Sequence, residues 1–118
     1  MANTFKLVTR DVAPASSGSP ETLYTVQTGS TIVVLGLTLA NVHTTSVTGT
    51  VQIVSTTTQT SQTQNTTAHL VKDIPVPNGA TVEIMAGNKI ILNAGDVVKI
   101  DCSVADKLSG TLSIMEIT

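Results

Sequence analysis

The segment "TIVVLGLTLAN", residues 31–41, carries apolar side chains on both faces of an extended chain. Because side chains alternate along a strand, one apolar set falls on each face: Val33, Leu35, Leu37 and Leu39 against Ile32 and Val34. Such a segment is typical of a central β-strand, or of a strand whose outer face meets a neighbouring subunit. We therefore predict a strand here, with Ile32, Val34 and Thr38 on an outer face that contacts another subunit.

Short strand-like segments fill the rest of the chain and are separated by Gly, Pro, Asn and Asp. They are "FKLVTR" (5–10), "ETLYTVQ" (21–27), "SVTGTVQIVS" (46–55), "AHLVKDIPV" (68–76), "NGATVEIMA" (78–86), "KIIL" (89–92), "DVVKIDCSV" (96–104) and "SGTLSIMEI" (109–117). No segment keeps a 3.6-residue apolar period long enough to predict a helix. The pattern predicts an all-β fold: a single antiparallel β-sandwich of eight or nine short strands. A jelly roll is one form of such a sandwich, and a small barrel is the alternative.

The chain has 118 residues, a length that indicates one domain. We expect residues 1–20 to form an N-terminal strand and a flexible arm, because "APASSGSP" (13–20) is rich in residues that break regular structure. Residues 21–118 then form the sandwich. An arm hinged in this way can reach a neighbouring subunit, and Phe5 is its candidate contact residue.

The segment "STTTQTSQTQNTT", residues 55–67, is a long loop without an apolar or charged side chain. Connections of about 4–6 residues are usual between strands, so this loop is expected to project from the surface. Its Thr and Gln side chains offer hydrogen-bonding groups without charge repulsion, which suits repeated contact between subunits. We predict such contacts at Thr57, Gln59, Gln62 and Gln64, and a disordered connector is the alternative.

The composition is apolar but poor in aromatic residues, with 41% hydrophobic residues, one Phe, one Tyr and no Trp. The core must therefore consist of Val, Ile, Leu and Met, and self-association is an expected further source of stability. The net charge of −2 gives no basic footprint for nucleic acid, and sugar recognition lacks aromatic platforms. No segment is long and apolar enough to cross a bilayer. The polar start "MANTFKLVTR" predicts a soluble chain that is not secreted by the usual route.

Few side chains suit catalysis or metal binding. His43 and His69 are far apart in the sequence and have no cysteine pair beside them, so a metal site is not expected. Cys102 alternates in register with Val98 and Ile100, which predicts a buried and unreactive thiol. Asp96 follows a glycine and reads as a turn residue. The sequence therefore predicts no enzyme, no cofactor and no small-molecule substrate.

Four stretches of the chain resemble small virion structural proteins of tailed phages, notably those of cyanobacteria. They are the strand at 34–41, the "VKDIPVPNGATVEI" strand pair at 71–84, the "GNKIILNAGDVVKI" hairpin at 87–100 and the ending "SIMEIT" at 113–118. The resemblance extends over residues 31–118, about three-quarters of the chain. These motifs are strand and turn patterns that contain no catalytic residues.

The resemblance implies a non-enzymatic component of the virion, assembled in the host cytoplasm. Its expected role is capsid decoration, in which a homo-oligomer, with a trimer favoured, binds the major capsid protein or another virion protein. A neck, tail or fibre-associated accessory protein is the alternative. A bacterial surface or pilus-like module is a third class, which would require a sorting signal or a donor strand.

Overall fold

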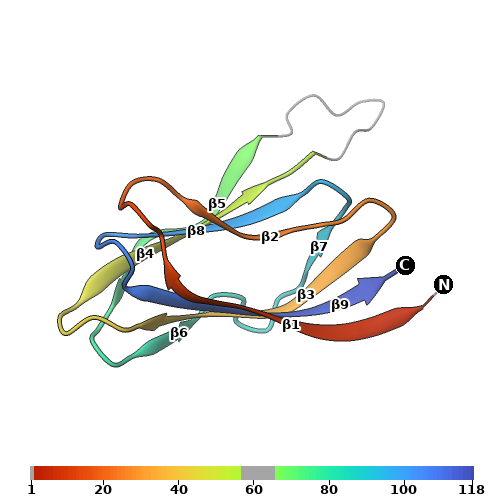
Figure 1. Cartoon of the computed structure of the whole chain (residues 1–118). Coiled ribbons are helices and arrows are strands. Elements are labelled where there is room, and N and C mark those ends of the chain that lie inside the picture. Colours follow the sequence, from red (N-terminus) through yellow and green to blue (C-terminus); the bar gives the residue numbers. More distant parts are fainter. Residues whose placement is uncertain (1, 57–65) are drawn as a thin grey trace.

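The computed structural model describes residues 2–56 and 66–118, which form two antiparallel sheets packed face to face (Figure 1). The strands are β1 (Asn3–Ala13), β2 (Glu21–Thr25), β3 (Thr31–Asn41), β4 (Val47–Val54), β5 (Thr67–Val76), β6 (Thr81–Glu83), β7 (Ile90–Leu92), β8 (Val97–Cys102) and β9 (Leu108–Ile117). The all-β sandwich predicted from the sequence is confirmed. Within the described ranges, no helix is long and apolar enough to cross a membrane.

The strands pair in a nested order. The first sheet runs β1-β9-β3-β6, with β7 also paired to β3, and the second sheet runs β2-β8-β4-β5. Thus β1 pairs with β9, β2 with β8, β3 with β6 and β7, and β4 with β5. These pairs form one long hairpin that is folded so that successive pairs of strands lie alternately in the first and the second sheet. This is the topology of a jelly roll.

Strand β3 contains a β-bulge that changes which of its side chains face the core. Its register with β9 shifts between Val34 and Gly36, so Leu35 is an extra residue and the alternation reverses there. Ile32 and Val34 on one side of the bulge, and Leu37 and Leu39 on the other, are all buried. The prediction that Ile32 and Val34 lie on an outer face is therefore wrong, because strict alternation does not hold across a bulge.

The side chain of Glu83 fills the gap between β6 and β7, on the side of β3 opposite to β9. Its Oε1 accepts hydrogen bonds from the backbone N–H of Leu37 (3.2 Å) and of Met85 (2.8 Å). The strand expected over residues 78–86 is consequently short: β6 ends at Glu83, and the chain turns before β7 begins at Ile90. The two three-residue strands β6 and β7 thus pair with different parts of the same edge of β3.

The core is aliphatic, as the composition predicts. Its buried hydrophobic residues are Ala, Val, Leu, Ile, Met and Cys, and Tyr24 is only partly buried against them. Cys102 is buried and unpaired, as predicted. Two glycines allow close packing between the sheets: a Cβ at Gly49 would lie 3.2 Å from Leu39 Cδ1, and one at Gly110 would lie 3.2 Å from Ile100 Cδ1.

The N-terminal segment is part of the sandwich, and the expected boundary at residue 20 does not exist. Strand β1 pairs with β9 from Asn3 to Ala13. The following turn is bound to the second sheet: Ser17 Oγ donates to the carbonyl of Cys102 (2.8 Å), and Gly18 N–H donates to Asp101 Oδ1 (3.2 Å). The segment predicted as a hinge is therefore held by hydrogen bonds.

Candidate interaction surface

The predicted contact residues do not all lie on the surface of the protein. Phe5 is 72% exposed on β1, and Thr38 lies half-buried on the outer face of β3. Ile32 and Val34 belong to the core. Four predicted contact residues, Thr57, Gln59, Gln62 and Gln64, lie outside the described residues. Of the predicted contact residues, Phe5 and Thr38 thus lie on the outer surface of the first sheet.

Four apolar side chains form a line across the outer face of the first sheet. Phe5 on β1 lies opposite Met115 on β9, Met115 lies opposite Val33 on β3, and Val33 lies opposite Ile91 on β7. Residues directly opposite one another in a sheet share a face, and the inward neighbours Ile114, Ile32 and Leu92 are buried. We call Phe5, Met115, Val33 and Ile91 the outer apolar row.

Further apolar side chains surround the outer apolar row. Leu7 is 65% exposed and lies opposite Ser113, and Ile117 lies opposite Asn3. The bulge residue Leu35 is also exposed. Scattered exposed apolar residues are normal, but a set that is continuous across four strands is typical of a surface that meets a partner. Phenylalanine and methionine are also enriched at protein interfaces.

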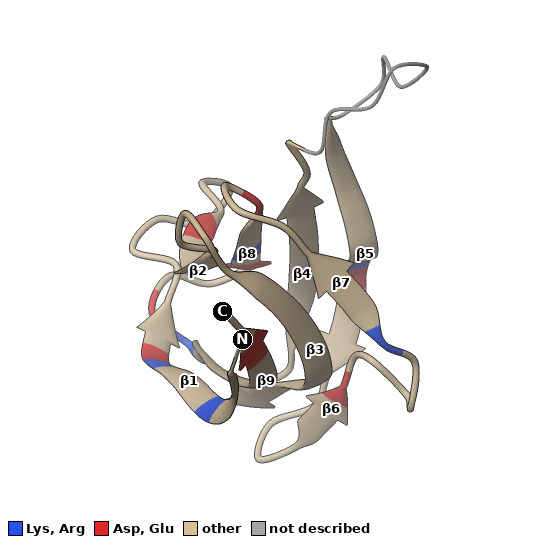
Figure 2. Cartoon of the chain, turned by 90° about the vertical axis from the view of Figure 1, so that its right-hand side faces the viewer, with Lys and Arg blue, Asp and Glu red and all other residues tan. Residues whose placement is uncertain are grey.

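Charged groups lie beside the outer apolar row but not in it. Figure 2 shows β3 without a charged residue along its length, in agreement with its sequence TIVVLGLTLAN. Lys6 and Arg10 on β1 form ion pairs with Glu116 and Glu21 respectively. The first pair joins Lys6 Nζ to Glu116 Oε1 at 2.8 Å, and Glu116 is buried. The cations of β1 are therefore neutralised within the chain.

Two pKa values are raised near this ion pair. The hydrogen bond from Lys6 to the Glu116 carboxylate, together with the charge of that carboxylate, raises the pKa of Lys6. Partial burial raises the pKa of Tyr24, and the negative charge of Glu116 adds to this effect. Both shifts favour the protonated form of the side chain, and both groups already carry their proton at neutral pH.

The polar loop is anchored at its first end by Asp96. This buried carboxylate accepts hydrogen bonds through Oδ1 from the Thr56 N–H (2.7 Å) and the Thr56 hydroxyl (2.9 Å), and through Oδ2 from the Asn93 N–H (2.9 Å). The prediction of Asp96 as a turn residue is confirmed. The same contacts fix the chain at residue 56, immediately before the predicted loop contacts.

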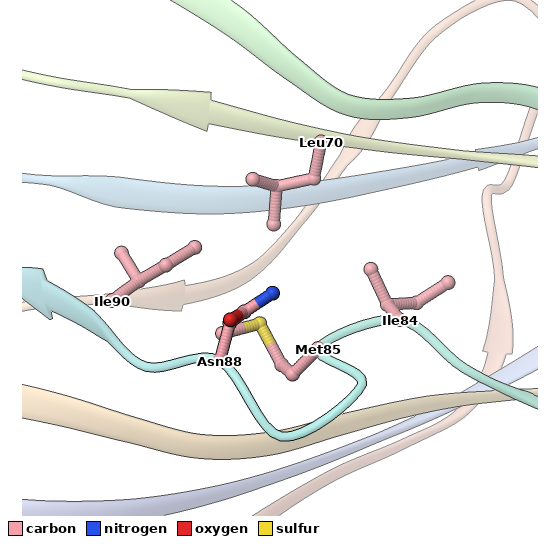
Figure 3. Close-up of a pocket in the computed structure, with 5 residues that line it drawn as sticks. All are labelled: Leu70, Ile84, Met85, Asn88 and Ile90. Carbon is pink, nitrogen blue, oxygen red and sulfur yellow. The ribbon is translucent and has the colours of Figure 1, made fainter.

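A shallow apolar pocket of about 190 Å³ opens between β5 of the second sheet and the β6–β7 connection of the first sheet (Figure 3). Its lining residues are Leu70, Ile84, Met85, Asn88 and Ile90. Asn88 is the one lining residue with a polar side chain. The pocket is separate from the outer apolar row, because Ile90 and Ile91 point to opposite faces of β7.

The two histidines have different surroundings. The backbone N–H of His43 donates to Asn41 Oδ1 (2.7 Å), and the His69 ring lies 3.2 Å from the Gln52 side-chain amide. Across residues 2–56 and 66–118, no three His, Cys, Asp or Glu side chains are grouped so that they could hold a metal ion.

Sequence reasoning missed most of the outer apolar row. Met115, Val33 and Ile91 were not predicted as contact residues, although each alternates with residues that are buried. The alternation was visible in the sequence, but it does not indicate which of two apolar faces points outward. Pairing across four strands, which makes the row continuous, could be found only from the sheet register.

Comparisons with known proteins give one distant structural likeness to report. A scan against protein-family models finds no match, and a search among curated proteins finds none. A chain from a structure described as "Bacillus endospore appendages form a novel family of disulfide-linked pili" is similar to this chain with a TM-score of 0.47 and 14% sequence identity. The match covers 99% of this chain and 87% of that chain. A likeness at this level carries no argument about function.

Proposed function

We propose that the chain is a non-enzymatic structural protein of a tailed-phage virion that decorates the capsid by binding the head lattice. The observation that carries this proposal is the outer apolar row. The chain has a single Phe, and this Phe is 72% exposed and in line with three other apolar side chains. The resemblance to virion proteins supports the identity of the partner, which is the major capsid protein or another virion protein.

The energetics of a small domain favour such a role. A domain of this size buries about 65% of the surface that its unfolded chain exposes, and here the aromatic side chains contribute little to the core. A partner that binds the folded state stabilises it by mass action. Because Phe5 lies on the surface, its large apolar side chain adds little to the stability of the core. It is available to anchor an interface with a partner.

Immunogold electron microscopy of particles from the source lysate tests the proposal directly. With an antibody raised against this chain, we expect label distributed over the capsids. Label confined to the neck or tail would replace decoration by the tail-accessory alternative. Particles without label would overturn the virion proposal.

A binding experiment with variants tests the surface. Purified chain with Phe5→Ser and Ile91→Ser is added to particles that lack it, and the bound fraction is compared with wild type. We expect at least tenfold weaker binding, because truncated hot-spot side chains typically cost more than 1 kcal/mol each. Val42→Ser is the matched control, since Val42 is an exposed apolar residue outside the row. Equal binding by the double variant would exclude the row as the contact surface.

A further inference from the structure

Strand β1 is the longest regular sheet edge in the described part of the chain. The other edge strands are interrupted or short: β6 and β7 have three residues each and β2 has five. The remaining edge strand, β5, has two register shifts, contains Pro75 and has a left-handed residue at Asp73, and such features block pairing with another chain. By contrast, β1 keeps an unbroken register with β9 from Asn3 to Arg10.

The hydrogen-bonding pattern of β1 shows which backbone groups point away from the sheet. Ala2 and Thr118 exchange both of their backbone hydrogen bonds, at 3.1 and 3.0 Å. Because such pairs alternate along an antiparallel ladder, the even-numbered residues of β1 bond to β9. The N–H and C=O groups of Asn3, Phe5, Leu7 and Thr9 then point to the open side, where the described residues place no strand.

We propose that two copies of this chain pair antiparallel along β1, with Leu7 on the twofold axis. In this register Leu7 faces Leu7 of the second copy, Phe5 faces Thr9, and Thr4 faces Arg10, so the pairing stays within the regular part of β1. The first sheets of the two copies then form one continuous sheet. The partner is a second copy of this chain because the edge is complementary to itself in this register.

Charge disfavours the two neighbouring registers, with the axis at Lys6 or Val8, and an axis at Leu7 pairs more of the regular part of β1 than one at Phe5 or Thr9. An axis at Lys6 would place the two Lys6 side chains opposite each other, and an axis at Val8 would place Lys6 opposite Arg10; like charges in such positions repel. An axis at Leu7 places Lys6 opposite Val8 and Arg10 opposite Thr4. Both cations are also paired within their own chain, with Glu116 and Glu21.

The size of the contact indicates a weak dimer. Seven paired residues, 4–10, span about 24 Å, so we expect the total buried area to lie below the roughly 1,200 Å² of most stable interfaces. We expect a dissociation constant in the micromolar range. The twofold axis is perpendicular to the sheet, so the outer apolar rows of both copies lie on the same side. A dimer therefore offers two adjacent rows to one partner, which increases avidity.

Sedimentation analysis from about 1 to about 300 μM tests the pairing. We expect a reversible monomer–dimer equilibrium for wild type. Leu7→Pro removes the N–H that faces the second copy and leaves the β9 ladder intact, so the dimer should be lost. Leu7→Thr keeps this N–H and is the matched control that retains the dimer, with less than about tenfold weaker association. A wild-type monomer, a trimer, or a dimer that persists in Leu7→Pro would overturn the proposal.

Disulfide cross-linking tests the register independently of the proline variant. The Cα atoms of Leu7 in the two copies should lie about 5.5 Å apart, within the range of a disulfide. Leu7→Cys should therefore form a covalent dimer on oxidation, and the native Cys102 does not compete because it is buried. Thr9→Cys is the control, since its two copies lie about 14 Å apart in this register. Equal cross-linking of both variants, or of neither, would contradict the proposed register.

This inference rests on the proposed function only in that both require contact between proteins. The two can fail separately. A chain that stays monomeric in solution leaves the particle-labelling experiment unaffected, and unlabelled particles leave the sedimentation result unaffected.

Discussion

Strands β1 and β9 lie side by side and run antiparallel through eight successive residue pairs (Figure 1), yet their burial differs. Along β9 every second residue is buried, from Leu108 to Glu116. Along β1, Ala13 alone is buried and Val8 is half-buried. Strand β9 has a neighbour on each side, whereas β1 is at the edge of the sheet. The position of a strand in the sheet, more than its own composition, therefore decides how much of it is buried.

The largest effect is expected for the inward side chains of one cross-strand pair, Leu112 of β9 and Val8 of β1. Leu112 is fully buried, so Leu112→Ala should lower the free energy of unfolding by about 3 kcal/mol through lost burial and a residual cavity. Val8→Ala should cost about 1 kcal/mol, because Val8 is only partly buried. Denaturant unfolding of both variants measures the two values. If both substitutions lowered the free energy of unfolding by similar amounts, the inferred effect of strand position on burial would be wrong.

A smaller effect is expected from adding one methyl group on each face of the first sheet. In Gly110→Ala the new Cβ would lie 3.2 Å from Ile100 Cδ1 and 3.5 Å from Leu23 Cδ1. We expect a loss of about 1 kcal/mol from overpacking. In Gly36→Ala the nearest atom is Glu83 Oε2 at 3.7 Å, so a gain of about 0.5 kcal/mol is expected from reduced chain entropy. Thermal unfolding distinguishes a stabilised variant from a destabilised one. A lower melting temperature for both variants would contradict the expected difference between the two faces.

Alkaline pH should weaken the contact between β1 and β9. The folded pKa of Lys6 lies above its ordinary value of 10.5, so above that pH the folded state holds a proton that the unfolded state has lost. The stabilisation by the Lys6–Glu116 pair is therefore complete below about pH 10.5 and disappears as pH rises through the folded pKa. The raised pKa of Tyr24 acts with the same sign.

Thermal unfolding of wild type and Lys6→Met across this alkaline range measures the contribution of Lys6. Wild type should be the more stable protein at neutral pH, and the two melting temperatures should converge as Lys6 loses its proton. Removing the Lys6 charge raises the pKa of Tyr24 further, which acts against the convergence, so Tyr24 does not account for it. A constant difference between the two curves would show that the ion pair does not couple to proton binding.

The smallest effect on stability is expected at the outer apolar row. Phe5→Ser removes a side chain that is 72% exposed, so the free energy of unfolding should change by no more than about 0.5 kcal/mol. Chemical denaturation of the purified monomer tests this value. A decrease in the free energy of unfolding above about 2 kcal/mol would mean that Phe5 packs within its own chain. Phe5 would then not be available to contact a partner.

The fold class could be predicted because strand alternation and turn residues are local properties of the sequence. The buried Cys102 and the turn at Asp96 were predicted for the same reason, and both are confirmed. Ile32 and Val34 were assigned to the wrong face because the bulge at Leu35 is defined by the pairing of β3 with β9, and the Glu83 carboxylate that binds the Leu37 N–H belongs to β6. Neither is visible within residues 31–41.

The sequence by itself determined that the chain forms an aliphatic β-sandwich, because Val, Ile, Leu and Thr alternate in short segments and aromatic residues are nearly absent. Only the tertiary structure decided which strands are edges and which apolar residues stay exposed. The outer apolar row joins residues 5, 33, 91 and 115, which are far apart in the chain. Their alignment follows from the backbone pairing of four strands, and the side-chain pattern of one strand does not show which strands lie beside it.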